Sequence, residues 1–361
     1  MKKRESNIEL LRIVSMALIV LYHIMFHGVL QGETTVSSNP DQLIALFMAV
    51  GGKTGVGIFV LISGFFLINK TNINLKSIRL LWSQVFFYSF GFLVLSRLLG
   101  SDSHWNVIDT IENLFPFIFN KYWFFTDYVI IMILVPFINA AVKNISRKAL
   151  TIGLVIFGIL WFAVPSIGTF LTHDVILLGV NEFITLIYMY ILGGYFRLYK
   201  PAWLQNTVLN SGLIIVGLLI TFLAENYFLS LGYQQKNVDL SNLAWQFDSL
   251  NSITVLALIV GLFGLFTAKR IGEVDWINKI ASATFGVYLI HDNEFVGRFI
   301  WSHLVKSKTL LDSPWYEFIW KSLLAMVVIY IVASVVELIR KGLVEQNLEK
   351  LLNNWSNENV H

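Results

Sequence analysis

The chain has 361 residues, of which 56% are hydrophobic, 15% aromatic and only 14% charged. Soluble domains carry roughly 25% charged residues, so this composition excludes an ordinary soluble enzyme and indicates an all-α, polytopic protein surrounded by membrane lipids. The net charge of +3 gives no reason to expect a nucleic-acid partner. Because the chain has no cysteine, a disulfide framework, a thiolate metal site and a cysteine nucleophile are excluded, and we expect no metal.

Ten stretches have the length and apolar character of a membrane span, which takes about 20 residues of helix. They cover approximately residues 8–27, 43–68, 78–99, 121–142, 149–170, 175–198, 208–230, 250–268, 279–300 and 316–339. The segment Trp105 to Phe119 is short and contains Pro116, so we expect an interfacial or re-entrant element there. We predict one transmembrane domain over residues 1–340 and a cytoplasmic tail over residues 341–361.

Lysine and arginine gather in alternate connections between these spans. The basic connections and the C-terminal end hold Lys70, Lys76, Arg79, Lys143, Arg147, Lys148, Arg197, Lys200, Lys269, Arg270, Lys279, Arg340, Lys341 and Lys350. Because positively charged loops stay in the cytoplasm, we expect both termini to be cytoplasmic in a multi-pass protein of the plasma membrane. Arg298, Lys306 and Lys308 cluster in the last outer loop, which either counts against the predicted topology of the last hairpin or indicates an anionic partner there.

Four titratable residues fall at a similar depth in the outer half of the membrane, on four different spans: His23, Asp127, Glu182 and His291. A titratable side chain in a bilayer is costly enough to indicate a functional site. Structural alternatives stay open: His23 can bond a neighbouring backbone, His291 can lie at the interface, and the two carboxylates can pair helices. His27 falls at or beyond the outer surface and is typical of an ordinary loop residue.

A basic group is expected at the cytoplasmic side. Arg12 lies about one turn inside the membrane, and Lys76 and Arg79 share one helix face because they are three residues apart. Such a cluster favours a phosphate-bearing ligand that enters from the cytosol, although flanking charges of this kind also arise from topology alone.

The second span contains Gly51-Gly-Lys53-Thr-Gly55, which lacks the first glycine of a nucleotide-binding loop and follows no strand. We therefore reject a nucleotide site. Small residues instead allow close helix packing or local unwinding. Lys53 lies inside the span and needs a carboxylate or an anionic substrate as partner; Asp127 and Glu182 have a suitable depth.

Five motifs occur in one order along the chain: Arg12-x10-His23, Gly55-Val-x-x-Phe-Val-Leu-Ile-Ser-Gly-Phe65, Lys76-x-x-Arg79, Trp123-Phe-Phe-x-x-Tyr128 and Phe285-Gly-Val-Tyr-Leu-Ile-His291. Together they resemble the acyltransferase-3 family of integral membrane acyltransferases. This resemblance implies a ten-helix domain that takes acyl groups, commonly acetyl, from cytosolic acyl-CoA. Such a domain transfers them to hydroxyls of glycans outside the membrane or on lipid carriers.

The resemblance also implies residue roles. His23 takes the place of the catalytic histidine and general base, Arg12 of an essential partner, and Lys76 with Arg79 of a basic pair that meets the CoA phosphates. Many relatives have arginine at both positions of that pair, so Lys76 replaces a bidentate contact by a point charge.

Further residues join these groups as candidates. We place His291, Asp127 and Glu182 with the catalytic residues, and Lys53 with the donor-binding residues. Gly57 stands where many relatives carry a carboxylate, which changes the expected partner of Lys53.

Acyl transfer from a thioester to an alcohol suits these residues, because imidazole can remove the hydroxyl proton near neutral pH. A donor entering past Arg12 would reach about 15 Å to His23, a length that suits a pantetheine arm. The leading hypothesis is an acyl-CoA-dependent O-acyltransferase that modifies a cell-envelope or exported polysaccharide. The alternative is a proton-coupled transporter or flippase of a glycan or lipid-linked sugar; the absence of an inverted repeat counts against it.

The charge pattern of the loops predicts that Ile145 is cytoplasmic and Val36 extracytoplasmic. Single cysteines at these positions in the cysteine-free chain can be treated with an impermeant maleimide in intact cells. We expect labelling at 36 and protection at 145, and the reverse pattern would contradict the predicted orientation.

Overall fold

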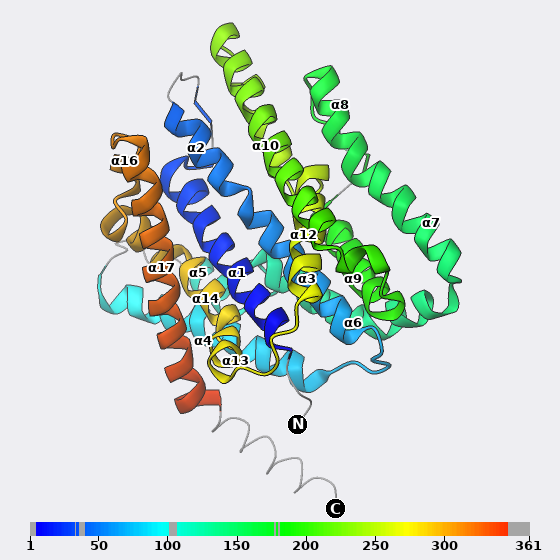
Figure 1. The fold of residues 1–361 in the computed structure, drawn as a ribbon. Coiled ribbons are helices and arrows are strands. Elements are labelled where there is room, and N and C mark those ends of the chain that lie inside the picture. The colour runs from blue at the N-terminus through cyan, green and yellow to red at the C-terminus, as the bar shows by residue number, and fades with distance from the viewer. Residues whose placement is uncertain are drawn as a thin grey trace, which may run out of the picture.

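The computed structural model describes residues 5–32, 34–35, 40–100, 107–176, 178–179 and 181–345. Over these residues the chain forms helices and no strand, which confirms the all-α class (Figure 1). Seven apolar helices among them have the length to cross a membrane: Ser6–Val29, Asp41–Leu67, Leu75–Leu98, Trp123–Asn144, Arg147–Thr172, Thr207–Gln235 and Trp315–Glu345. The chain is therefore a multi-pass membrane protein.

The helices follow one another in this order: α1 (Ser6–His23), α2 (Pro40–Ala49), α3 (Gly51–Leu67), α4 (Leu75–Leu98), α5 (Val107–Leu114), α6 (Trp123–Asn144), α7 (Arg147–Gly158), α8 (Val164–Thr172), α9 (Glu182–Tyr199), α10 (Thr207–Gln235), α11 (Val238–Asn242), α12 (Ile253–Ala268), α13 (Asp275–Ala281), α14 (Thr284–His291), α15 (Glu294–Phe299), α16 (Ser307–Leu310) and α17 (Trp315–Arg340). Shorter π-helical turns are η1 (Ile24–Val29), η2 (Ile159–Ala163), η5 (Ile300–Leu304) and η6 (Lys341–Glu345), and 3₁₀ turns are η3 (Ala202–Gln205) and η4 (Leu243–Phe247).

Side-chain caps fix where many of these helices begin. The oxygen of an Asn or Ser accepts a hydrogen bond from a backbone N–H in the first turn, which satisfies a donor that the helix itself cannot pair. The capping residues are Asn74, Ser146, Asn181, Asn206, Asn237, Ser252 and Asn293.

Two expected spans differ from the structure because of such caps. The sixth was expected over 175–198, but α9 begins at Glu182 behind its cap Asn181, so Glu182 lies at the helix start and not about two turns inside. The ninth was expected as one helix over 279–300. The structure divides it into α13, α14 and α15, and Asn293 starts the last of these by accepting hydrogen bonds from two backbone N–H groups.

The short segment before the fourth long helix forms α5, an eight-residue helix that lies against α4. Ser89 of α4 donates a hydrogen bond to the Asn113 side chain at 2.9 Å, and Arg97 lies 3.7 Å from Asp109. This element does not span the membrane, in agreement with the expectation for residues 105–119; residues 105 and 106 lie outside the described residues.

The start of α1 and the end of α17 lie at the same end of the bundle (Figure 1), which we name the terminal end. Lys341 donates a hydrogen bond to the Ser282 carbonyl there. The first residues of the expected tail form η6, which continues the last helix to Glu345, and the Glu345 carboxylate pairs with Arg340 at 2.6 Å. The rest of the expected tail, residues 346–361, lies outside the described residues.

Glycines let α3 pack closely between α1 and α9. A Cβ atom on Gly64 would come within 1.9 Å of the Tyr190 carbonyl oxygen, and one on Gly193 within 2.0 Å of the Leu61 carbonyl oxygen. A Cβ on Gly55 would meet the Ser15 carbonyl oxygen at 2.4 Å. The small residues of the second span therefore serve close helix packing, and this packing fixes α1 in the centre of the bundle.

Replacing Gly64 by Ala should destabilise the protein by about 1–3 kcal/mol, because the new methyl group forces α3 and α9 apart. Gly91→Ala is the matched control, since a Cβ on Gly91 meets no atom within 4 Å. Thermal unfolding of the purified protein in nanodiscs measures both. Equal melting temperatures for the two variants would contradict the close contact.

Candidate active site

Two histidines predicted from different spans meet in the bundle. His23 ends α1, His291 ends α14, and their ring centroids are 4.9 Å apart. Both side chains are buried, with 7% and 0% of their surface exposed. The chain continues from α1 into the π-helical turn η1, in which His27 lies 5.0 Å from His23, ring centroid to centroid. Three imidazoles therefore form one cluster.

Asp292 adds a carboxylate to this cluster. Its Oδ1 atom lies 3.5 Å from Nδ1 of His23, which is close enough for an ion pair. The ligand atoms of His23, His27 and Asp292 all lie within 4.8 Å of one another. Two imidazoles and one carboxylate are a donor set that zinc accepts, so this group has the chemistry to hold a divalent cation, which the sequence analysis did not anticipate.

The protonation of His291 follows from one contact. Its Nδ1 atom lies 2.5 Å from the Val287 carbonyl oxygen. A carbonyl only accepts, so Nδ1 carries the proton and Nε2 of the neutral ring is left with its lone pair. Nε2 is buried and has no hydrogen-bond partner among the described residues. His291 therefore offers an unpaired proton acceptor beside His23.

Helix α14 is held in place from the other side by α17. Glu337 is fully buried and accepts hydrogen bonds from Gln84, Tyr88 and Arg340 at 2.7–3.0 Å. A Cβ atom on Gly286 of α14 would lie 2.4 Å from the Glu337 side chain. The glycine of the Phe-Gly-Val-Tyr-Leu-Ile-His motif thus makes room for a paired carboxylate, and this contact fixes α14 and its histidine.

Lys53 pairs with Glu182, one of the two carboxylates that its depth suggested. Its ammonium also lies 4.4 Å from the centre of the Trp123 ring. Asp127 is half-buried on α6 and makes no ion pair with Lys53 or a histidine within the described residues. Gly57, which has no side chain to pair with Lys53, lies against Ile259 of α12: a Cβ atom there would come within 2.3 Å of the end of the Ile259 side chain.

A cavity of about 370 Å³ opens at the terminal end; we name it the terminal cavity. Arg12 lines it together with Lys341, and Arg12 pairs with Glu9 at 3.2 Å. Ser63 and Tyr128, both from the predicted motifs, also line it and are joined by a hydrogen bond of 3.0 Å. Basic and hydroxyl groups therefore face one another at the end of the bundle that the loop charges predict to be cytoplasmic.

The remaining predicted basic residues are placed elsewhere. Lys76 and Arg79 are exposed at the start of α4 and do not line the terminal cavity, although Leu81 of the same helix does. Lys53 pairs with Glu182 and does not line the terminal cavity that contains Arg12, and its assignment to donor binding stays a prediction.

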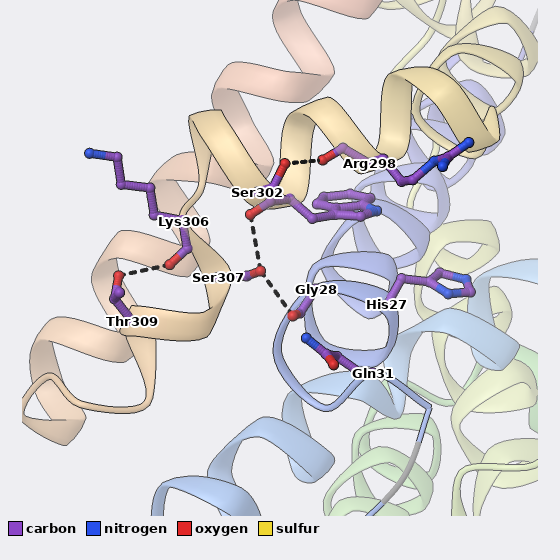
Figure 2. Close-up of a pocket in the computed structure, with 9 residues that line it drawn as sticks. His27, Gly28, Gln31, Arg298, Ser302, Lys306, Ser307 and Thr309 are labelled. Atoms are coloured by element: carbon purple, nitrogen blue, oxygen red, sulfur yellow. Dashed lines mark hydrogen bonds between the residues drawn. The ribbon is translucent and has the colours of Figure 1, made fainter. Parts of the chain in front are cut away.

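A second cavity, of about 500 Å³, lies beyond the histidines; we name it the distal cavity (Figure 2). His27 and Gly28 of η1 form one wall, and residues 298–309 form the other. The Ser307 hydroxyl lies 2.9 Å from the Gly28 carbonyl oxygen and ties the two walls together.

A comparison with protein-family models shows which family the chain belongs to. The acyltransferase-3 family model, described as an acyltransferase domain, matches residues 5–338. The chain belongs to the acyltransferase-3 family. No curated protein and no solved structure matches it. His23, His291 and Arg12 of this acyltransferase lie within the matched region.

Several residues of the candidate site were not predicted from the sequence. His27 was assigned to an outer loop, but the π-helical turn directs it toward His23. Asp292 follows His291 directly in the sequence, and that adjacency was the available signal. Lys341 was assigned to the cytoplasmic tail, because basic residues commonly follow a membrane span on that side. Tyr288 lies within the Phe285–His291 motif, from which no role was predicted for it; its hydroxyl is buried and makes no well-formed hydrogen bond among the described residues.

Replacing Asp292 by Asn removes the charge that faces His23 and keeps the shape. We expect acyl transfer to slow roughly 10-fold to 100-fold, as when a histidine loses a carboxylate that orients it. Asp239→Asn is the control, because Asp239 is exposed in α11 and makes no ion pair with a histidine among the described residues. Initial rates of the purified acyltransferase measure the effect, and equal rates for both variants would remove Asp292 from the site.

Proposed function

We propose that this membrane acyltransferase moves an acyl group, most simply acetyl, from cytosolic acyl-CoA to a hydroxyl of a cell-envelope or exported polysaccharide at the plasma membrane. The observation that supports this proposal is that aromatic and histidine side chains in contact with one another connect the terminal cavity to the distal cavity, with the histidines between the two. Phe124, which lines the terminal cavity, lies 5.9 Å from Tyr288, and Tyr288 lies 6.4 Å from His291. His291 contacts His23, and His23 contacts His27 at the distal cavity.

The donor binds at the terminal end in this proposal. Arg12 and Lys341 supply cations inside the terminal cavity, and Lys76 and Arg79 supply them on the surface at the start of α4. Cationic side chains bind phosphate through charge-assisted hydrogen bonds. The CoA phosphates stay at this end, while the pantetheine arm extends toward His23, about 15 Å further along α1.

In the proposed reaction one proton moves twice, first from the acceptor hydroxyl to His23 and then from His23 to the CoA thiolate. The Asp292 carboxylate favours a proton on Nδ1 of His23, so Nε2 acts as the base. It takes the proton of the acceptor hydroxyl while the oxygen attacks the thioester carbonyl carbon. The oxyanion accepts a hydrogen bond from the Tyr288 hydroxyl. The carbon–sulfur bond then breaks, the CoA thiolate takes the proton back from His23, and the ester and free CoA leave.

The variant His23→Gln distinguishes a catalytic role of His23 from a structural one, because glutamine forms hydrogen bonds but takes up no proton at neutral pH. We expect this variant to fold and bind acyl-CoA while its transfer rate falls roughly 10²-fold to 10⁴-fold. Radiolabelled acetyl transfer by the purified protein measures the loss. A near-normal rate would return His23 to a structural role, and a wild type that consumes no CoA thioester would favour the transporter.

The donor assignment predicts that Lys341→Gln and Arg79→Ala each raise the acyl-CoA concentration for half-maximal rate. A charge-assisted hydrogen bond of about 1.5–3 kcal/mol corresponds to about tenfold or more. Lys148→Ala is the control, since Lys148 is exposed at the start of α7 and lies outside the terminal cavity. Unchanged donor dependence in both test variants would place CoA elsewhere.

A further inference from the structure

We propose that the distal cavity is the acceptor subsite and that it selects a saccharide that carries negative charge. This inference rests on the proposed function, because it names the class of the acceptor. It explains why Arg298 and Lys306 lie in a connection that the orientation of the chain predicts to be extracytoplasmic, where basic residues are otherwise scarce.

The position of the cavity joins it to the histidines. His27 lines the distal cavity and lies 5.0 Å from His23, ring centroid to centroid. Ser307 on the opposite wall lies 2.9 Å from the Gly28 carbonyl oxygen and 3.0 Å from that of Trp301 (Figure 2). A Cβ atom on Gly28 would come within 3.1 Å of Ser307. A ligand in the cavity is therefore bound against the same turn that carries His27.

The lining of the cavity has a positive charge balance. It contains the cations Arg298 and Lys306, and none of its nine residues is a carboxylate. Arg298 contacts Glu294 through one N–H group at 3.3 Å, which leaves other guanidinium donors for a ligand. Lys306 is exposed and forms no ion pair with the described residues. These two cations match the carboxylate or phosphate of an acidic sugar.

The other lining groups suit the sugar ring itself. Trp301 supplies an aromatic surface, and Gln31, Ser302 and Thr309 supply an amide and two hydroxyls. The volume of about 500 Å³ lies within the usual range of small-molecule sites. An anionic lipid headgroup would share the charge, but the aromatic ring, the amide and the hydroxyls of the lining match a sugar ring, so we assign the cavity to the glycan.

Binding of a charged and a neutral trisaccharide tests this inference. The full-length acyltransferase is placed in phosphatidylcholine nanodiscs without acyl-CoA, and its affinity for α-1,4-trigalacturonate is compared with that for α-1,4-galactotriose. We expect the acidic sugar to bind at least tenfold more tightly and to lose affinity as salt rises. Arg298→Gln and Lys306→Gln should each reduce the preference about threefold or more. Lys236→Gln, which removes a basic residue at the end of α10 outside the cavity, should not.

Four results would overturn the inference, and the first three are equal affinity for the two sugars, no trigalacturonate binding, and an equal effect of the Lys236 variant. A fourth is that the Arg298 and Lys306 variants change only the retention of phosphatidylglycerol, which would identify a headgroup site. Because the assay needs no acyl-CoA, its failure is distinct from that of the proposed function. If the protein transfers acyl groups without a preference for charged sugars, the acidic acceptor is rejected and the transferase function stands. If it binds acidic sugars selectively but consumes no thioester, the transferase function is rejected and the acidic subsite stands.

Discussion

A membrane interior provides no water for charged side chains, so each buried charge must find a partner within the protein. The charged groups that hold the candidate site follow this constraint, whereas the buried carboxylates of Glu225 and Asp248 have no cationic partner among the described residues. Glu337 is paired with Arg340 and two neutral donors, Lys53 with Glu182, and His23 faces Asp292. These pairs also fix positions, because a charge that leaves its partner would be exposed to lipid.

The Glu337 group connects the fold to the chemistry. It holds α17 against α4 and, through Gly286, against α14. Helix α14 carries Tyr288 and His291 directly to the end of α1, which the glycines of α3 keep in the centre of the bundle. The cluster of histidines is thus set by two independent packing contacts, and neither involves a histidine itself. Such rigidity keeps a proton acceptor at a fixed place between two cavities.

The sequence predicts the parts that depend on local composition. Apolar length located the long spans, and the order of motifs identified the family that the comparison then showed. It also selected His23 and His291, because intramembrane histidines are rare. The carboxylate that faces His23 was harder to predict, because Asp292 takes this position only where the ninth span breaks before the cap Asn293. Lys341 was hard to predict for a similar reason, because it lines the terminal cavity only where the last helix continues beyond residue 340. Helix breaks and tertiary pairing of this kind leave little signal in hydropathy.

The most direct measurement is mass spectrometry of envelope glycans from cells with and without this acyltransferase, grown so that cytosolic acetyl-CoA carries a heavy isotope. The account predicts an isotope-labelled ester on a glycan hydroxyl that is present only with the protein and is released by mild alkali. Identical glycan masses in the two cell types would contradict the claim that this site transfers an acyl group from acyl-CoA to a polysaccharide.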